Sequence, residues 1–156
     1  MIIRQAISRD VTECVGLVEN RREIYQQYEP RFWKKAPNSA RSSADWFGRL
    51  FLDSHNVSLV AEEGEKVVGF LIAREFPTPP VYDPGGPTAL IDDFCVATPD
   101  RWSDVGARLV DAARLELRSR GFAQIIVVGA PKNDAKTKFL KGTDLSLAST
   151  WWTAAT

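Results

Sequence analysis

The stretch from residue 88 to residue 121 limits the folds open to this chain more than any other segment. It reads TALIDDFCVATPDRWSDVGARLVDAARLELRSRG, which is a β-type run, a short polar turn and a helical pattern. The apolar positions of the helix lie four residues apart and form one stripe: Val105, Leu109, Ala113 and Leu117. Gly121 follows as a helix stop. A strand that leads through a turn into an amphipathic helix predicts a sheet covered by helices.

Strand and helix patterns alternate along the rest of the chain. Strands are expected at residues 2–7, 57–63, 66–75, 88–96, 124–130 and 145–152, and helices from residue 10 into the twenties and at 42–51, 106–119 and 133–141. Residues 76–87 hold five of the nine prolines and are expected to form a long loop. This order predicts a mixed α/β fold in one domain over residues 1–156. Its central twisted sheet is expected to be mostly antiparallel, with about six to seven strands and helices on both faces.

The charge balance argues against nucleic acid and membrane surfaces as partners. Twenty basic residues balance twenty acidic ones, so no net field attracts polyanions. The chain shows neither a secretory leader pattern nor an apolar run of the ~18 residues that a membrane span needs, which predicts a cytoplasmic protein. With two cysteines and one histidine, no ligand set for a structural zinc can be assembled, and no metal site is expected.

The last two expected strands differ in composition. Residues 124–130, QIIVVGA, are nearly all apolar, as in a strand that is buried on both faces. Trp151 and Trp152 end the final strand. They either pack on the sheet or form part of an edge at which two copies of the chain make a homodimer.

Three segments, in this order, resemble the GNAT superfamily of acetyl-CoA-dependent N-acetyltransferases. The first, VAEEGEKVVGFLIA, is similar to the central hairpin of that family. The second, IDDFCVATPDRWSDVGARLVDAARLELRSRG, is similar to its fourth strand, pyrophosphate turn and following helix. The third, NDAKTKFL, is similar to the asparagine-bearing helix beside the pantetheine arm of the coenzyme. The resemblance covers nearly the whole chain and implies a GNAT-like fold with acetyl-CoA as co-substrate.

The resemblance assigns a coenzyme-binding role to the turn after the fourth strand. The family pattern Q/R-x-x-G-x-G/A falls on Arg101, Trp102, Ser103, Asp104, Val105 and Gly106. Main-chain amides of this turn and of Ala107 would hold the pyrophosphate at the start of the helix. Arg101 and Gly106 match the pattern, whereas Asp104 replaces the middle glycine. The alternative is a plain helix start, in which the Asp104 carboxylate stabilises the first helical turn.

Further coenzyme contacts are implied on the fourth strand and the last helix. By resemblance, backbone amides around Phe94, Cys95 and Val96 would meet the acetyl and pantetheine groups. Asn133 and Phe139 would lie beside the pantetheine arm. These roles depend on the resemblance alone.

The resemblance also implies direct attack of an amine on the acetyl thioester, with an acidic base on the fourth strand. Asp92 and Asp93 occupy this strand. Because side chains alternate along a strand, only one of the two is expected to face the cleft, and Asp92 is favoured. The alternative is that both are solvated or paired at a strand end.

The usual acid of the family, a tyrosine in the last helix, is missing from this chain. The corresponding positions are Phe139 and Leu140. Either Tyr25, Tyr28 or Tyr82 reaches in from a loop as the acid, or the thiolate leaves unassisted or takes its proton from water. The lysines around this helix are expected on a solvated face, with attraction of coenzyme phosphates as the alternative. They are Lys132, Lys136, Lys138 and Lys141.

The expected function is N-acetyltransfer from acetyl-CoA to an amine of a small molecule or a peptide. A second hypothesis is a catalytically impaired GNAT-fold protein that binds an acyl-CoA or a protein partner. A third is an unrelated α/β interaction domain. Coenzyme binding separates the third hypothesis from the first two, and turnover separates the first from the second.

Overall fold

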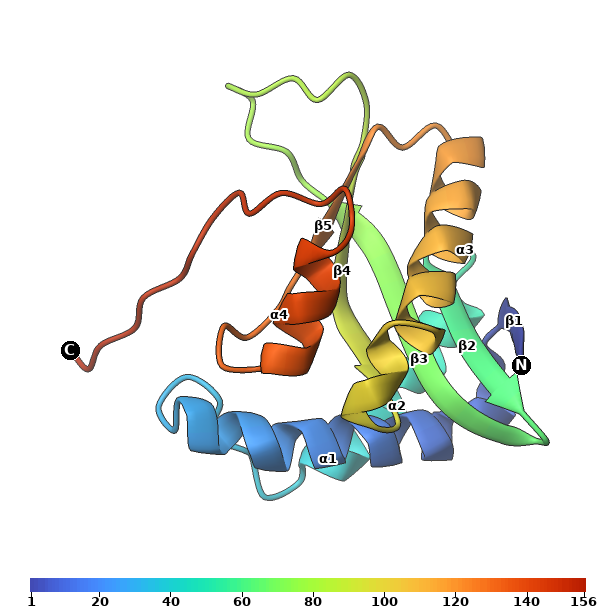
Figure 1. Cartoon of the computed structure of the whole chain (residues 1–156), viewed down its shortest axis with the longest axis vertical. Helices are drawn as coiled ribbons and strands as arrows, with labels where there is room; N and C mark the ends of the chain where they lie inside the picture. Colours follow the sequence, from blue (N-terminus) through green and yellow to red (C-terminus); the bar gives the residue numbers. More distant parts are fainter.

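The computed structural model describes residues 1–156 and contains five strands, four α-helices and two short 3-10 helices (Figure 1). The strands are β1 (Ile2–Gln5), β2 (Val57–Glu63), β3 (Lys66–Phe76), β4 (Thr88–Val96) and β5 (Gln124–Val127). The helices are α1 (Val11–Tyr28), α2 (Ser39–Leu52), α3 (Val105–Ser119) and α4 (Asp134–Lys141), with η1 (Ser8–Asp10) and η2 (Pro99–Trp102) as the 3-10 turns. The expected alternation of strands and helices is thereby confirmed.

The strands form a single sheet in the order β1-β2-β3-β4-β5. The first three pairings are antiparallel, and β4 pairs with β5 in parallel. This matches the predicted mixed, mostly antiparallel sheet. The parallel pairing is possible because α3 carries the chain back along one face of the sheet between β4 and β5.

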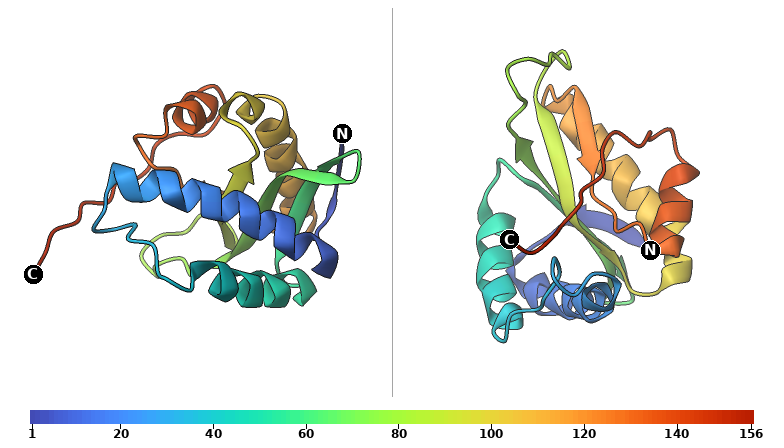
Figure 2. Two further views of the ribbon diagram at one scale, coloured as in Figure 1. Left: turned by 90° about the horizontal axis from the view of Figure 1, so that it is seen from below. Right: turned by 90° about the vertical axis from the view of Figure 1, so that its left-hand side faces the viewer.

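Helices cover both faces of the sheet, as predicted. Figure 2 shows α1 and α2 on one side, and α3 and α4 on the other. Each side has its own apolar core: one cluster includes Val18, Phe47 and Phe70, and the other includes Leu71 and Leu109. The sheet is therefore buried between two helical layers in its central part.

The apolar stripe of α3 faces the sheet as the sequence predicts. Val105, Leu109, Ala113 and Leu117 are all buried in one core cluster. Gly69 on β3 lies directly under this helix. A Cβ at this position would lie 2.6 Å from Val105 Cγ1, so only glycine permits the observed approach of α3 to β3.

The hairpin between β2 and β3 closes through a two-residue turn. Glu63 pairs with Lys66, and the residues between them, Gly64 and Glu65, have φ values of 51° and 67°. Positive φ at both central residues is the type I′ arrangement that matches the twist of a hairpin. The sequence predicts this hairpin with a tight turn around Glu63 and Gly64; the hairpin is confirmed, and its turn is centred one residue later.

The C-terminal segment differs from the sequence expectation. No strand forms over residues 145–152; Trp151 and Trp152 are exposed, and the chain end runs away from the body (Figure 1). As a result β5 is an edge strand, and Ile126 is 36% exposed rather than buried on both faces. Both this C-terminal segment and residues 124–127 have the apolar composition of a strand. In the structure, however, β5 ends at Val127 and pairs only with β4. Trp151 and Trp152 therefore do not pack on the sheet, and the alternative, a dimer edge formed by a final strand, lacks that strand.

A smaller difference from the expectation concerns the start of α2. The helix expected at residues 42–51 begins earlier, at Ser39. Ser43, expected near its start, is instead buried inside the helix, where its hydroxyl donates to the Ser39 carbonyl. Residues 77–87 form the long loop that their prolines predict. None of the helices combines the length and apolarity that crossing a bilayer would require.

Candidate functional site

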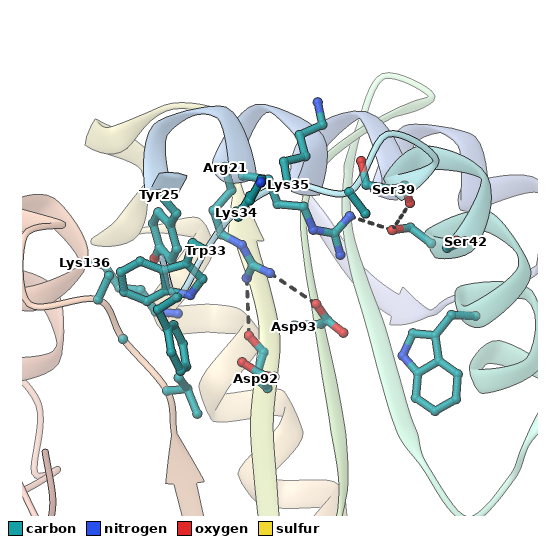
Figure 3. A pocket seen from close by; sticks show the side chains of 18 residues that line it. Arg21, Tyr25, Trp33, Lys34, Lys35, Ser39, Ser42, Asp92, Asp93 and Lys136 are labelled. Carbon is teal, nitrogen blue, oxygen red and sulfur yellow. Dashed lines mark hydrogen bonds and ion pairs between the residues drawn. The ribbon is translucent and has the colours of Figure 1, made fainter. Parts of the chain in front are cut away.

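A cavity of about 520 Å³ lies between α1, the α1–α2 loop, α2, the middle of β4 and the segment after β5. We call it the α1–β4 cavity. Its lining includes Arg21, Tyr25, Trp33, Asp92, Asp93 and Lys136 (Figure 3). Segments far apart in the sequence therefore meet around one space that is large enough for a small molecule or a single side chain.

A bulge in β4 shapes the wall of this cavity. Leu71 on β3 pairs with Phe94, whereas Ala73 pairs with Ile91, so β4 contains one more residue than β3 between these pairs. The extra residue interrupts the alternation of side chains along β4. Ile91 and Phe94 consequently belong to the same core cluster although they are three residues apart.

Asp92 and Asp93 are the residues inside this bulge, and both line the α1–β4 cavity. The expectation that strand alternation lets only one of them face the cleft is therefore wrong. Strict alternation holds only for a regular strand, and the sequence gives no signal for the bulge.

The two aspartates have different partners. Arg21 on α1 donates from Nη2 to Asp93 Oδ1 at 3.2 Å, and its Nη1 donates to the backbone carbonyls of Asp92 and Phe94 (Figure 3). The Asp92 side chain is exposed and takes part in no ion pair. The Asp93 carboxylate is thus neutralised by Arg21, and the Asp92 carboxylate is available to a ligand.

The cavity also reaches the unpaired edge of β4. Strand β5 pairs only with Thr88–Ile91, so the part of β4 beyond Ile91 has a strand neighbour on one side only. Residues 128–130, which follow β5, line the cavity beside this edge. A ligand could approach the backbone of β4 here without displacing a strand.

A hydrogen bond between Asn133 and Tyr25 connects the start of α4 with α1. Asn133 Nδ2 donates to the Tyr25 hydroxyl at 3.2 Å, and Asn133 Oδ1 accepts from the Lys136 amide at 3.1 Å as the N-cap of α4. Burial raises the pKa of the Tyr25 phenol. The tyrosine that reaches this region therefore comes from a helix, whereas Tyr82 is 72% exposed on the 77–87 loop.

Lys136 is the functional candidate that sequence reasoning placed wrongly. It was expected on a solvated face with its neighbouring lysines, but it is buried and its Nζ lies 5.0 Å from the Phe94 ring centroid and 5.2 Å from that of Trp102. Burial lowers its pKa to about 7, and the nearby Arg21 charge acts in the same direction. The sequence contained one signal for this placement: helical spacing puts Lys136 on the same face of α4 as Asn133 and Leu140.

The turn from Arg101 to Gly106 is closed by its own charges. Arg101 pairs with Asp104 and with Glu63 on β2, and the Asp104 carboxylate accepts from the Val105 amide at 2.6 Å. The Arg101 guanidinium holds the pKa of the Asp104 carboxyl below its usual range. Gly106 and Ala107 follow in the first turn of α3, where main-chain amides commonly lack intrahelical partners.

An aromatic cluster lies beneath this turn. Trp102 is buried, contacts Phe94 edge-to-face at 4.9 Å between ring centroids, and stacks on Phe139 at 5.8 Å. A Cβ at Gly106 would lie 2.9 Å from Trp102 Cε3. The Trp102 ring therefore requires a glycine at position 106, whether or not the turn binds a phosphate.

The remaining predicted residues lie around these two centres. Cys95 is buried in the core under α1 and α2, and Val96 packs against the core under α3. Ser103 is exposed, and Ala107 lines a second cavity of about 270 Å³ between α3 and α4. The structure thus brings the aspartates together with Lys136, and the turn together with Phe94 and Phe139.

Comparison with known proteins identifies the family to which this fold belongs. The sequence profile of the acetyltransferase (GNAT) family matches residues 18–142, which is more than half of the chain. The chain belongs to the GNAT family. The bulged β4, the turn before α3 and α4 are all inside the matched part of this GNAT chain.

Solved structures share this GNAT chain's fold over almost its full length. A tetramutant of the BH1408 protein from Bacillus halodurans has a TM-score of 0.83 at 18% identity, with 100% of both chains covered. A predicted acetyltransferase with acetyl-CoA from Clostridium acetobutylicum has a TM-score of 0.74 at 17% identity, over 99% of this chain and 95% of that one. Ribosomal-protein-alanine N-acetyltransferase from Brucella melitensis biovar Abortus 2308 has a TM-score of 0.66 at 17% identity, with 99% of each chain covered.

At these identities the likeness concerns the fold alone. A comparison with curated proteins found no match. The acceptor and the role of each residue in this GNAT chain must therefore be argued from its own geometry.

Proposed function

We propose that this protein transfers an acetyl group from acetyl-CoA to a primary amine held in the α1–β4 cavity. The observation that carries the proposal is the bulge of β4, which directs Asp92 and Asp93 into one cavity of a GNAT-family chain. A cationic amine is attracted to carboxylates, and a cavity of about 520 Å³ admits a small amine or the end of a peptide side chain.

Asp92 is the proposed base. Its carboxylate lines the cavity, is exposed there, and has no ion-pair partner, whereas Asp93 is bound to Arg21 at 3.2 Å. A base must be free to accept a proton from the ammonium group of the acceptor, directly or through a water molecule. Arg21 keeps Asp93 in place and fixes the backbone of the bulge through its bonds to two carbonyls.

Tyr25 is the proposed acid. Its hydroxyl lies at the cavity, receives a hydrogen bond from Asn133, and retains its own proton because burial raises its pKa. The phenol can therefore donate a proton to a leaving thiolate. This assigns to α1 the role that the family resemblance places on the last helix.

The turn from Arg101 to Gly106 is the proposed site for the coenzyme diphosphate. The amides of Gly106 and Ala107 lie at the N-terminus of α3, where the helix dipole favours negative charge. Arg101 would add a positive charge once it leaves Asp104. Asp104 opposes binding, since its carboxylate already occupies the Val105 amide.

The reaction follows from these positions. The acceptor gives one proton to Asp92, and its neutral nitrogen attacks the thioester carbonyl. The new N–C bond forms, the C–S bond breaks, and the leaving thiolate takes a proton from Tyr25. The nitrogen then loses its second proton, which returns Tyr25 to its neutral form, and Asp92 releases the first proton to solvent. The products are an N-acetyl amine and free coenzyme A.

A second candidate function is supported by the Asp104–Arg101–Glu63 ion pairs, which close the turn. If these pairs persist, the protein is a catalytically impaired member of the fold that binds an acyl-CoA weakly or binds a protein partner. Binding and turnover, measured separately, distinguish the two functions.

The test is thermal unfolding and calorimetry with acetyl-CoA, followed by an assay of coenzyme A release with a panel of amines. A ligand at ~100 times its dissociation constant adds about 2.7 kcal/mol of stability. The proposal predicts stabilisation and amine-dependent release. Stabilisation without release would favour the second candidate, and no stabilisation at millimolar acetyl-CoA would overturn both coenzyme-dependent functions.

A further inference from the structure

The amine of Lys136 is the one buried side-chain amine that faces the α1–β4 cavity. The residue is only 1% exposed, yet its Nζ forms no ion pair and no hydrogen bond within the chain. Its Nζ lies over the faces of two aromatic rings, at 5.0 Å from the Phe94 centroid and 5.2 Å from the Trp102 centroid. An ammonium group over aromatic rings is attracted to them, but much more weakly than it is hydrated in water.

Lys136 borders the cavity. No fully buried side-chain nitrogen or oxygen in the protein lacks a hydrogen-bond partner. Because Lys136 Nζ has no such partner, its nitrogen is not fully enclosed, and Lys136 is one of the residues that line the cavity. The cavity is therefore the route by which we expect a small molecule to approach this nitrogen.

The charges around Lys136 come from two elements. Arg21 on α1 disfavours its protonated form, whereas the Asp92 and Asp93 carboxylates on β4 favour it. No carboxylate lies within ion-pair distance, so burial outweighs these attractions and the pKa of the amine falls to about 7. At neutral pH a large fraction of the amine is unprotonated and nucleophilic.

We propose that Lys136 is itself an acylation site, whose amine takes the acyl group of a thioester that enters the α1–β4 cavity. The Lys136 nitrogen attacks the thioester carbonyl, an N–C bond forms and the C–S bond breaks. The proton lost by the nitrogen goes to the leaving thiolate, so the products are Nε-acyl-lysine and a free thiol. The proposal rests on the proposed function for the natural source of the thioester.

The surroundings of Lys136 favour the product over the free amine. An amide carries no charge, so acylation removes the buried cation from its position between the rings of Phe94 and Trp102. The acyl group would extend toward the cavity that Asp92 and Asp93 line. Acylation would therefore place a neutral group where the proposed acceptor amine binds, and we expect it to inhibit transfer to other amines.

The test uses a small thioester, N,S-diacetylcysteamine, which does not need the coenzyme-binding turn. The full chain is incubated with it from pH 6 to pH 10, and the acetylated lysines are identified by peptide mass spectrometry. Lys138 is an internal control, since it is exposed on the same helix two residues away. At pH 7 we expect Lys136 to react at least about tenfold faster than Lys138, with a midpoint of its pH profile near 7.

Equal or slower reaction of Lys136, or a rate that continues to rise beyond pH 9, would overturn the proposal. Variants Lys136→Arg and Lys136→Met should lose this label, and the internal comparison in the unmodified chain holds even if a variant does not fold. Parallel calorimetry with acetyl-CoA separates the two proposals. Labelling by the small thioester without acetyl-CoA binding would contradict the proposed function only, and coenzyme turnover without Lys136 labelling would contradict the acylation site only.

Discussion

Residue-scale differences determine which groups of the α1–β4 cavity can do chemistry. Asp92 and Asp93 are adjacent in sequence and lie in the same bulge, yet only Asp93 has a cationic partner, Arg21 at 3.2 Å. Lys136 has the opposite character, a cation with no anionic partner at all. Sequence reasoning identified both aspartates and favoured Asp92, but on the ground of strand alternation. It could not find the ion pair that distinguishes them, because the partner of Asp93 lies on α1, about seventy residues away.

The first prediction concerns the two aspartates. Asp92→Asn should lower kcat by roughly 10²- to 10⁴-fold, the range usual for loss of a general base, with little change in KM for acetyl-CoA. Asp93→Asn should mainly lower stability, since it leaves the Arg21 guanidinium without its carboxylate. Steady-state kinetics and thermal unfolding of both variants check this. Equal, small kinetic effects would remove the proposed base, and an exchange of the two effects would reverse the assignment.

The second prediction concerns the pH dependence of stability at Lys136. Its pKa is about 7 in the folded protein and 10.5 ordinarily, so between these values the unfolded chain binds a proton that the folded chain does not. The stability contributed by this group therefore rises with pH. Lys136→Met should be more stable than the unmodified chain at pH 7, by up to roughly 4 kcal/mol, with a difference that shrinks toward pH 10.

Denaturant unfolding of both chains at pH 7, 8 and 9 measures this difference. Comparing the two chains removes the contribution of the buried thiols Cys14 and Cys95 to the pH dependence, because both chains contain them. Burial raises the pKa values of these thiols, so they titrate only at higher pH. A stability difference that does not change with pH would show that Lys136 keeps an ordinary pKa. That result would also remove the basis of the acylation site.

Elements differ in how completely the sequence predicts them. The stripe on α3 and the β2–β3 hairpin follow from spacing and turn chemistry that involve neighbouring residues only. The bulge of β4 does not, because it is defined by the pairing of β4 with β3. Lys136 was placed wrongly because helical spacing gives one face of α4 but does not tell which neighbours, here η2 and β4, lie against it.

The third prediction concerns the turn before α3. Asp104→Gly should strengthen acetyl-CoA binding by about fivefold or more, since it removes a carboxylate near the diphosphate and frees Arg101 and the Val105 amide. Ser103→Gly is the matched control, because Ser103 is exposed in the same turn and carries no charge. Calorimetry that shows unchanged or weaker binding in Asp104→Gly would mean that the turn is only a helix start, or that its carboxylate helps the ligand.

The fourth prediction tests the contact between α3 and the sheet. Gly69→Ala should lower the free energy of unfolding by about 1–3 kcal/mol, because the new Cβ would lie 2.6 Å from Val105 Cγ1 and 3.1 Å from the Cys95 carbonyl oxygen. Gly48→Ala is a control of opposite sign. It lies inside α2 with no atom within 4 Å of a Cβ, so it should stabilise by about 0.5–1 kcal/mol. Similar effects at both positions would contradict the observed packing.

At the scale of the whole molecule, two helical layers on one sheet leave the C-terminal residues without a role in the core. Residues 146–156 are all exposed, including Trp151 and Trp152 at 85% and 94%. The sequence suggested a strand here because apolar residues are frequent in this segment. Strand formation, however, needs a partner edge, and the segment makes no pairing with β5.

The fifth prediction follows from this arrangement. Deletion of residues 146–156 should change the free energy of unfolding by less than about 0.5 kcal/mol, as is usual for exposed positions without buried contacts. Thermal unfolding and light scattering of the full and shortened chains check this. A large loss of stability, or a change in mass from dimer to monomer, would show that the segment packs in solution as a strand or an interface.

The central claim is that the α1–β4 cavity is where an amine receives an acetyl group from acetyl-CoA. The most direct measurement is the mass of the amine product after incubation of the protein with acetyl-CoA and a mixture of primary amines. We predict at least one N-acetyl amine, formed by the unmodified chain and reduced at least ~10²-fold in Asp92→Asn. Bound acetyl-CoA with no acetylated amine, or equal product from both chains, would contradict the claim.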